Sequence, residues 1–432
     1  MRLLTLLVTA CTTFALTSPA ASRAEPAAEP EPAGEPVTLE TDGRRPSGPC
    51  ALRGMTDSVS EAADTPPGFA RSNGTVRALT LFVDFPDAQA EGTPQERYAE
   101  FFPAVADYYR TSSYGRLDYR STPVPRWIRM SRKYAAYGIA RGAPFERGYR
   151  ALSKEIVDAV DDTVDFRRFD LVNVLVTPNA GPPATEDVQS VTFAGAPTGL
   201  TTGDGTPFKN VSFIWSRQTG DSPYRVLNHE NAHAFGLPDL YYTGGGSGLL
   251  KTPVGHWDLM DEDWGPSDDF LAWHKWKLGW LAPGQVECVM TPGPRTVTLT
   301  PASVPGGTKL TVVPLSRTRA VTVEARARGP LDRTVCRPGV LVTTLATDIP
   351  SGAGPVHVSD ATPGSDGCWT TDPNVNPQLS DAPYVVGERF STGGVRVAVT
   401  GRDPDGNWRV TVERLRPPSS RLSRPASGAA RG

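Results

Sequence analysis

The most informative stretch of this chain runs from residue 229 to residue 239 and reads His229-Glu-Asn-Ala-His-Ala-Phe-Gly-Leu-Pro-Asp239. His229 and His233 are four residues apart, so on a helix they project from one face, one turn apart. Imidazole nitrogens at that spacing can bind one tetrahedral Zn²⁺. Glu230 lies beside the first histidine, where its carboxylate can accept a proton from a water that the metal activates. The stretch therefore predicts one catalytic zinc ion with a general base next to it.

The residues after the second histidine can supply a third ligand. Gly236 can end the helix by adopting a positive φ. The Leu-Pro pair that follows then turns the chain, so that Asp239 returns to the metal and a fourth position stays open for water, as in catalytic zinc sites. The alternative third ligand is a Glu on a later helix, for which Glu262 is the nearest downstream candidate. We favour Asp239, because Glu262 does not lie on a convincing helix.

A surface helix whose two histidines merely titrate is the competing interpretation. The chain has only five histidines, so a chance match is improbable, and Gly236 and Asp239 are independent further matches. The helix itself is predicted for residues 223–235, with Ser222 as its cap and Pro223 in its first turn. Its apolar side chains recur at helical spacing: Val226, Leu227, Ala234 and Phe235.

The extended motif His-Glu-x-x-His-x-x-Gly-Leu-Pro-Asp-x-Tyr, which ends at Tyr241, resembles that of the immune inhibitor A family of secreted bacterial metallopeptidases. It is also similar to the zinc motif of metzincin peptidases, with Asp in place of the usual third His. Three flanking segments agree with the family: a helix and turn ahead of the active site at 107–115, the methionine turn at 257–260, and the close of the catalytic domain at 278–281. The resemblance covers residues 76–413 and implies a metzincin-like zinc endopeptidase that acts on proteins.

One position departs from the metzincin pattern. Some metzincins place a Tyr two residues after the turn methionine, here Met260, and that position is Glu262. The motif therefore names no residue that stabilises the transition state. Candidates by residue type alone are Tyr241, Tyr242, His256 and His274. For the two histidines a surface or structural role is the better interpretation.

The N-terminus has the pattern of a secretory signal peptide. Residues 1–24 combine a short positive start, an apolar stretch and a small-residue site, so we expect cleavage after Ala24. The apolar stretch is too short to span a bilayer, and no later segment approaches the roughly 18 apolar residues of a span. A lipoprotein anchored through Cys11 is the alternative, but Cys11 comes too early for a full apolar core ahead of it. We predict a secreted protein without a membrane span.

Four cysteines remain after the signal peptide, at positions 50, 288, 336 and 368, which suggests two disulfides and allows three pairings. We expect Cys336 to pair with Cys368 inside the C-terminal domain. For Cys50 two interpretations compete: a bridge to Cys288, or a propeptide thiolate that occupies the open zinc position and keeps the enzyme latent. The even cysteine count favours the bridge, because a thiol switch would leave Cys288 unpaired in an oxidising compartment.

Length and composition predict a two-domain globular protein. The chain has 432 residues, of which 38% are hydrophobic and 21% charged, and its net charge of −3 favours neither nucleic acid nor an anionic membrane as a partner. Residues 25–75 are predicted to be a Pro-rich linker or propeptide, and residues 416–432 a disordered tail. The arginines of this tail could instead anchor the protein to a cell wall. We expect a monomer whose partners are protein or peptide substrates.

Residues 76–285 alternate apolar runs with helical stretches, which predicts an α+β, zincin-like catalytic domain. Buried strands are expected at 78–85 and 171–177. Helices are expected at 96–109, 151–160, 223–235 and 270–280. We expect the tryptophan stripe of the last helix in the core rather than at a ligand site: Trp273, Trp276 and Trp280.

From 286 to 415 the pattern becomes all-β, with short β-rich runs separated by Pro/Gly turns. We expect a β-sandwich packed beside the catalytic domain. Residues 395–399 and 408–412 flank a Gly-Arg-Asp-Pro-Asp-Gly turn and should form a hairpin. Asp403 and Asp405 of this turn could bind a structural Ca²⁺, but the turn alone explains them.

Together these features predict a secreted zinc endopeptidase. Zinc held by the two motif histidines and Asp239 would polarise the scissile carbonyl, and Glu230 would pass a proton from water to the leaving amine. The alternative, from another class, is a secreted binding or adhesion protein with a vestigial zinc site, in which the β-sandwich is the working part. The intact Glu230 argues against it, because a zinc site without catalysis needs its ligands but not the base.

Overall fold

The computed structural model describes residues 46–54, 59–140, 144–180, 190–195, 198–215, 224–243, 252–261, 269–368 and 379–416. The predicted signal peptide at 1–24, the predicted tail beyond residue 416, the predicted helix start at Ser222 and Pro223, and the rival ligand Glu262 lie outside these residues. No helix within the described ranges is long and apolar enough to cross a membrane.

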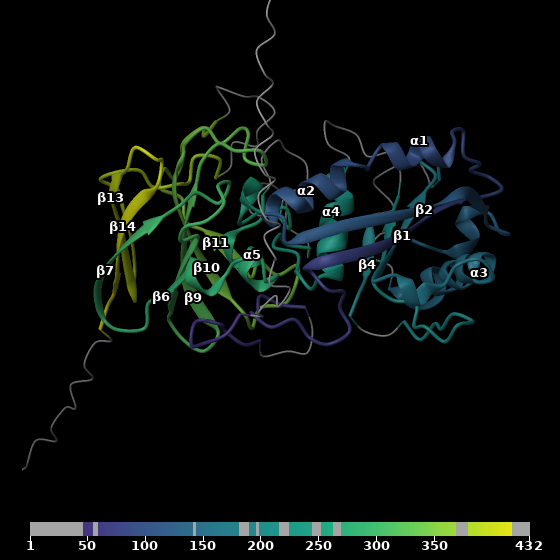
Figure 1. Ribbon diagram of the computed structural model, residues 1–432, viewed down its shortest axis with the longest axis horizontal. Coiled ribbons are helices and arrows are strands. Elements are labelled where there is room, and N and C mark those ends of the chain that lie inside the picture. Colours follow the sequence, from purple (N-terminus) through teal and green to yellow (C-terminus); the bar gives the residue numbers. More distant parts are fainter. Residues whose placement is uncertain are drawn as a thin grey trace, which may run out of the picture. The chain divides into compact units, whose positions relative to one another are not determined.

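The N-terminal part is built on a mixed five-stranded sheet in the order β2-β1-β3-β5-β4 (Figure 1). Its strands are β1 (Gly74–Asp84), β2 (Leu117–Arg129), β3 (Leu171–Val176), β4 (Val191–Phe193) and β5 (Val211–Ile214). β1 pairs in parallel with β2 and β3, β3 pairs in parallel with β5, and β4 runs antiparallel to β5. The strands predicted at 78–85 and 171–177 correspond to β1 and β3 and are confirmed.

The described helices are α1 (Pro94–Ala99), α2 (Ala104–Ser112), α3 (Arg150–Val160), α4 (Tyr224–Ala234) and α5 (Ala272–Lys277). Shorter helical turns are η1 (Tyr134–Tyr137), η2 (Phe145–Tyr149), η3 (Phe166–Arg168), η6 (Gly255–Trp257) and η7 (Pro283–Gln285). α3 and α4 confirm the helices predicted at 151–160 and 223–235.

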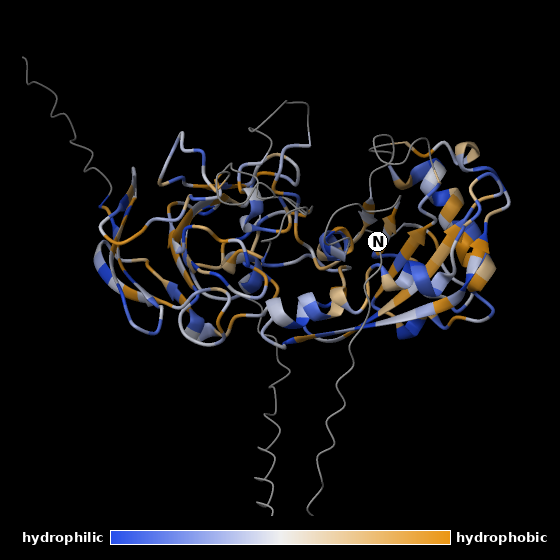
Figure 2. Cartoon of the chain, turned by 90° about the horizontal axis from the view of Figure 1, so that it is seen from above, coloured by the Kyte–Doolittle hydropathy of each residue, from blue (hydrophilic) through white to orange (hydrophobic). Residues whose placement is uncertain are grey.

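Helices cover both faces of the sheet, which explains why its central strands are largely buried and rich in apolar residues. β3 and β5 are buried at every residue, and several strands of this sheet are orange, hence hydrophobic, in Figure 2. On β1, Leu79 and Leu81 share a hydrophobic cluster with α3, whereas Ala78 and Phe82 share another with α2 and α4. The sheet therefore supports α4, the helix that carries the zinc motif, from one side.

Two of the predicted helices are shorter in the structure. The helix predicted at 96–109 is split into α1 and α2, because Pro103 has no amide N–H to donate and disfavours helical backbone in the residue before it. The helix predicted at 270–280 is reduced to α5, which ends before Gly279, a residue with a φ of 76°. The tryptophan stripe of this region is buried, as predicted: Trp273, Trp276 and Trp280.

The C-terminal part contains two β-sheets and, among its described residues, only the short turn η7 beside them. One sheet has the order β11-β10-β9-β8-β6 and the other β12-β13-β14-β7 (Figure 1). The strands are β6 (Val286–Cys288), β7 (Gly293–Leu299), β8 (Leu310–Pro314), β9 (Arg319–Arg326), β10 (Gly339–Ala346), β11 (Val356–Val358), β12 (Arg389–Thr392), β13 (Val395–Arg402) and β14 (Trp408–Arg414). β13 and β14 pair antiparallel, which confirms the predicted hairpin.

The five-stranded sheet of the C-terminal part buries both of its faces. On β9, Val321 and Val323 share a hydrophobic cluster with β7, β13 and β14 of the other sheet. On β10, Leu341 and Leu345 share a different cluster with Trp273 and other residues of the N-terminal part. Successive strand residues point to opposite faces, so one strand contributes to both clusters. The two parts of the chain are therefore joined by a common core.

Residues 46–72 differ from the linker or propeptide predicted for 25–75. Cys50 and Leu52 are buried in the cluster that joins the two parts of the chain. The ammonium group of Lys277 donates to the carbonyls of Ser60 (2.7 Å) and Ala62 (2.6 Å). The described part of this segment is thus built into the core. This packing has no local sign in the sequence, because the ammonium group that binds the Ser60 and Ala62 carbonyls lies more than 200 positions away along the chain.

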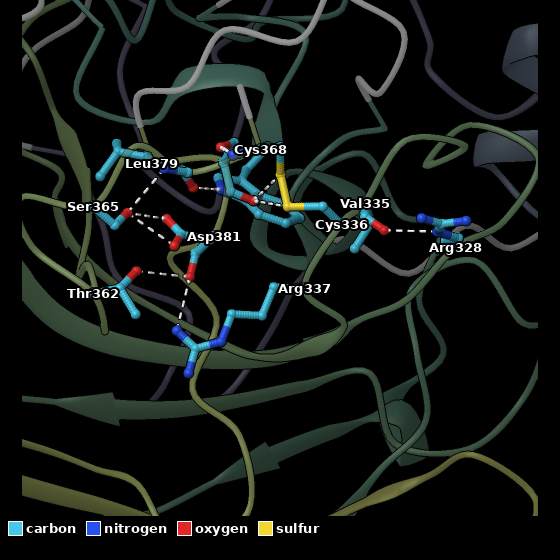
Figure 3. Close-up of a disulfide and its surroundings, with 12 residues drawn as sticks. Arg328, Val335, Cys336, Arg337, Thr362, Ser365, Cys368, Leu379 and Asp381 are labelled. Carbon is cyan, nitrogen blue, oxygen red and sulfur yellow. Dashed lines mark hydrogen bonds between the residues drawn. A yellow bond between two sulfur atoms is a disulfide. The ribbon is translucent and has the colours of Figure 1, made fainter. Parts of the chain in front are cut away.

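Both predicted disulfides are present. Cys50 is joined to Cys288, with Cα atoms 5.8 Å apart, and Cys336 to Cys368, with Cα atoms 6.0 Å apart. The first bridge excludes the thiol switch considered for Cys50, since that sulfur is bonded to Cys288. Figure 3 shows the second bridge next to a polar turn, in which the Ser365 hydroxyl lies 2.9 Å from the Asp381 carboxylate.

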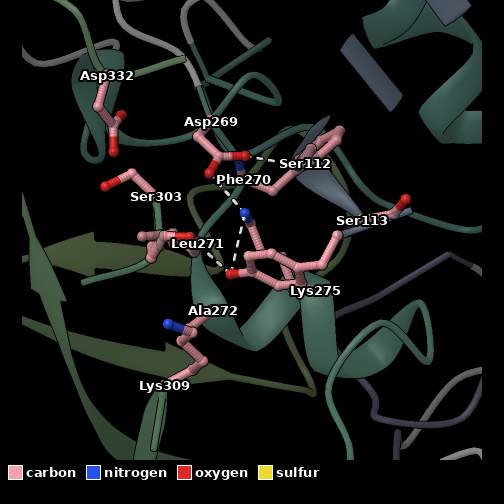
Figure 4. Close-up of polar contacts among 12 residues, drawn as sticks. Ser112, Ser113, Asp269, Phe270, Leu271, Ala272, Lys275, Ser303, Lys309 and Asp332 are labelled. Carbon is pink, nitrogen blue, oxygen red and sulfur yellow. Dashed lines mark hydrogen bonds and ion pairs between the residues drawn. The ribbon is translucent and has the colours of Figure 1, made fainter. Parts of the chain in front are cut away.

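Buried ion pairs lie near α5 and on β9 of the five-stranded sheet in the C-terminal part. The ammonium group of Lys275 donates to Asp269 over 2.5 Å (Figure 4). On β9 the Arg326 guanidinium contacts Glu324 (3.1 Å) and Asp332 (2.6 Å). All five side chains are at most 3% exposed. Removing one partner of such a pair leaves an uncompensated charge in the core, so these pairs restrict how the two parts can pack.

Candidate metal centre

α4 presents the two motif histidines with their Nε2 atoms toward a common point. His229 Nδ1 lies 2.9 Å from the carbonyl oxygen of Leu259, and His233 Nδ1 lies 2.8 Å from that of Leu237. A carbonyl oxygen only accepts hydrogen bonds, so in both rings Nδ1 carries the proton. When the ring is neutral, Nε2 therefore keeps its lone pair, which is the arrangement that metal-binding histidines require. When the ring is protonated, Nε2 faces the Asp239 carboxylate instead and donates to it.

Asp239 completes the group. Its Oδ1 atom lies 3.2 Å from Nε2 of His229 and 3.2 Å from Nε2 of His233. α4 ends at Ala234, and Gly236 just beyond it has a φ of 96° that reverses the chain. The amide of Leu240 then donates to the Met260 carbonyl over 2.9 Å. The structure thus brings the three residues named from the motif together.

The donor set fits zinc. Two imidazole nitrogens and one carboxylate oxygen lie within 4.8 Å of one another, and such a three-ligand set is the composition of catalytic zinc sites. The side chains are 7% (His229), 17% (His233) and 18% (Asp239) exposed, so the group is accessible from one side. Among the residues that the structure describes, this is the one cluster of His, Cys, Asp or Glu side chains able to hold a metal.

The charges of the centre reinforce one another. Burial raises the pKa of Asp239, but the positive charge of His233 and the hydrogen bonds from both imidazoles outweigh it and hold this pKa far below its usual range. Burial lowers the pKa of His233, but the Asp239 carboxylate raises it above the ordinary value. A carboxylate that stays ionised is the form that binds a cation.

Glu230 lies on the same helix and is only 5% exposed. Burial raises the pKa of its carboxyl group, against the lowering effect of His233, of His229 and of a hydrogen bond from Thr192. The Thr192 hydroxyl, on the edge strand β4, lies 2.7 Å from Glu230 Oε2 and 2.8 Å from the Ser212 hydroxyl of β5. A raised pKa suits a general base, because a carboxylate whose pKa is closer to neutral pH accepts a proton more readily.

The back of α4 is fastened to the sheet by buried polar groups. The Asn231 amide donates to Asn173 (2.9 Å) and to Ser212 (3.1 Å), and its oxygen accepts from the Tyr119 hydroxyl (2.6 Å). These bonds link the helix to β2, β3 and β5. They fix the rotation of α4, and hence the direction in which its histidines point.

The turn predicted from residues 257–260 lies next to the centre. Met260 is fully buried, and the carbonyl of its neighbour Leu259 is the group that orients His229. Asp258 Oδ1 accepts from the amide of Met260 (2.8 Å), and Asp261 accepts from the amide of Val254 (2.6 Å). Two aspartates therefore hold the turn in shape.

The other sequence candidates have different positions. His274 is fully buried between two carboxylates and does not reach the centre. His256 is buried, neither of its nitrogens has a hydrogen-bond partner among the described residues, and burial together with Arg326 lowers its pKa to about 3. Both are internal histidines, as the preferred interpretation held. The Tyr241 ring lies 6.3 Å from the His229 ring, whereas the Tyr242 hydroxyl contacts His357 of β11.

The sequence did not point to several residues of the centre. Thr192, Leu259 and Ser351 contact Glu230, His229 and Asp239 respectively, from three separate regions. Leu259 lies in the turn predicted at 257–260, but nothing in the residue type or spacing of Thr192 and Ser351 distinguishes them from ordinary loop and strand residues.

Comparison of the chain with protein-family models and with curated proteins finds no match. The resemblance to immune inhibitor A peptidases therefore depends on the motif and its flanking segments alone.

At the Asp403 turn, the carboxylate accepts from the backbone amide (2.8 Å) and the side chain (3.0 Å) of Asn407. These local bonds account for the acidic residue without a Ca²⁺ ion.

Proposed function

We propose that this protein is a secreted zinc-dependent endopeptidase of the immune inhibitor A type, with a metzincin-like catalytic part. The observation that carries the proposal is the convergence of His229 Nε2 and His233 Nε2 on Asp239 Oδ1, with the carboxylate of Glu230 on the same helix. The fixed Nδ1 protons support it further, because they leave both Nε2 atoms ready to bind metal.

His229, His233 and Asp239 would hold the zinc ion. When bound, zinc supplies a Lewis acid that polarises a peptide carbonyl and makes a nearby water more acidic. Glu230 would accept one proton of that water as the water oxygen bonds to the carbonyl carbon. It would then deliver the proton to the amide nitrogen as the C–N bond breaks, which gives a carboxylic acid and an amine.

Thr192 would hold the base in place during this transfer. Its hydroxyl contacts Glu230 Oε2 and is itself linked to Ser212 on the neighbouring strand. A carboxylate fixed through one oxygen presents the other in a defined direction, which favours proton transfer over random collision.

Secretion is part of the proposal. The two disulfides support it, since such bonds persist mainly in oxidising compartments. N-terminal sequencing of the protein recovered from culture medium should give Glu25 as the first residue, following cleavage after Ala24.

The function is tested by proteolysis of a denatured protein substrate with the purified full chain. We expect cleavage to stop when a chelator removes the metal and to return on addition of Zn²⁺. Activity that persists without metal would contradict a zinc peptidase. Stoichiometric zinc binding without any cleavage would favour instead the binding or adhesion protein with a vestigial site.

A further inference from the structure

The third ligand of the metal centre is held by the C-terminal β part of the chain. Ser351 lies in the connection between β10 and β11. Its hydroxyl oxygen accepts from the backbone amide of Asp239 (2.9 Å) and lies 3.2 Å from Asp239 Oδ2. A serine hydroxyl can accept one hydrogen bond and donate another, so both contacts form at once.

The main chains of the two segments also run side by side. The Gly352 amide donates to the Asp239 carbonyl (3.1 Å), the Thr243 amide donates to the Gly352 carbonyl (2.9 Å), and Tyr242 forms an antiparallel bridge with Ala353. A Cβ atom at Gly352 would lie 2.3 Å from the Thr243 hydroxyl oxygen, so the close approach requires glycine. Ser351 is thereby held at a fixed distance from the ligand.

The two oxygens of the Asp239 carboxylate have separate tasks. Oδ1 lies against the Nε2 atoms of both histidines, and Oδ2 lies against Ser351. A carboxylate without this second contact could rotate about its Cα–Cβ and Cβ–Cγ bonds and turn Oδ1 away. The hydroxyl therefore restricts which oxygen faces the metal position, as outer hydrogen-bond partners do for metal ligands in general.

We infer, on the basis of the zinc centre proposed above, that Ser351 is a positioning residue for Asp239 and that the β part of the chain completes the metal site. The inference extends the proposed function because it assigns to the C-terminal part a role in metal binding. It also implies that residues 76–285 alone would bind zinc more weakly than the full chain.

The sharpest test compares Ser351→Thr with Ser351→Val in the full chain, because these side chains have the same shape and differ by one hydroxyl. Zinc affinity is measured by competition with a chromophoric chelator, and the ligand field by the visible absorption of the Co²⁺-substituted protein. We expect the valine variant to bind zinc about 10–100-fold more weakly than the threonine variant, with shifted Co²⁺ bands.

Ser351→Ala against the unchanged chain provides the same comparison without a branched side chain, in case the site cannot accept one. Ser359→Ala is the matched control, because Ser359 also contacts a polar partner in the β part, the Tyr384 hydroxyl (2.9 Å), but not the metal ligands. It should bind zinc like the unchanged protein. Circular dichroism of the metal-free proteins separates loss of fold from loss of affinity.

Hydrogen exchange gives a readout that does not depend on substitution. Added zinc should slow exchange of the Gly352 amide, since that amide bonds to the ligand residue itself. The role of Ser351 would be overturned, and the zinc centre left intact, by equal zinc affinity and equal Co²⁺ spectra in two comparisons. These are Ser351→Thr with Ser351→Val, and the unchanged chain with Ser351→Ala. Failure of the unchanged protein to bind zinc would instead refute the proposed function.

Discussion

The candidate metal centre and the group formed by Glu61, His274 and Asp258 contain the same residue types in different hydrogen-bonding arrangements. At the candidate centre Nδ1 of each imidazole donates a hydrogen bond to a backbone carbonyl, and Nε2 faces the position of the metal. His274 has a carboxylate on each nitrogen, Glu61 at 3.0 Å and Asp258 at 2.7 Å. The partner of the second nitrogen therefore decides whether a buried histidine can bind a metal or becomes a fixed cation.

The two groups are connected through the turn beside α4. Asp258, which pairs with His274, also accepts from the amide of Met260. The carbonyl of the intervening residue, Leu259, orients His229. A structural ion pair in the core thus supports the position of a metal ligand, although it lies outside the metal centre.

Among substitutions at the candidate metal centre, Glu230→Gln should have the largest effect on peptide hydrolysis. Gln cannot accept the proton, so we expect turnover to fall by about 10²–10⁴-fold. Zinc content, measured by atomic absorption, should stay equal to that of the unchanged protein, because Glu230 is not a ligand. A variant that keeps more than about a tenth of the rate would show that another group is the base.

In the group formed by Glu61, His274 and Asp258, His274→Gln should have the largest effect on the free energy of unfolding. The substitution removes the positive charge and leaves Glu61 and Asp258 as buried charges without their partner, which costs about 3–5 kcal/mol of unfolding free energy. Urea unfolding measures the loss. His357→Gln, an exposed histidine, is the control and should change stability little. A loss no larger than that of the control would contradict the fixed-cation assignment.

Asp239→Ala should weaken zinc binding more than the roughly 10–100-fold expected from loss of an outer hydrogen-bond partner, since it removes a ligand and its charge. Zinc titration with a competing chelator checks this. Asp403→Ala, a turn aspartate bonded to Asn407, should leave zinc affinity unchanged. Full zinc content in the Asp239 variant together with loss in Glu262→Ala would reverse the ligand assignment.

The pH dependence of the unfolding free energy reports whether His274 is charged in the folded protein. Burial lowers the pKa of His274, but Asp258 and Glu61 raise it from 6.5 to about 10. A group whose pKa is raised by folding stabilises the protein fully below its unfolded pKa, and that contribution is lost as the pH rises through the folded value.

The difference in unfolding free energy between the unchanged protein and His274→Gln should therefore be largest near pH 6 and shrink toward about pH 10. Lys277, whose pKa burial lowers to about 8, titrates in both proteins, so the comparison removes its contribution. A difference that grows with pH would show that His274 is neutral in the folded state.

Strands whose signal lies in neighbouring residues of the sequence were predicted correctly, whereas packing against residues far along the chain was not. The strands 78–85 and 171–177 were found because whole runs of their residues are apolar, which is a local signal. The packing of the described part of segment 46–72 had no local signal, because its contacts are with residues far along the chain, such as Lys277. The break at Pro103 carried a local signal that an apolar pattern on both sides of it obscured.

The inner part of the candidate metal centre follows from the amino-acid sequence alone. His229, Glu230, His233 and Asp239 lie within one helix turn or one tight reversal of each other, so backbone geometry alone brings them together. Only the folded chain supplies what surrounds them: the Leu259 carbonyl, the hydroxyls of Thr192 and Ser351, and the carboxylates of Asp258 and Glu61, which raise the pKa of His274 against the effect of burial. These contacts join residues 16 to 213 positions apart, and the free energy of a buried charge depends on its neighbours in space, which residue type and spacing do not specify.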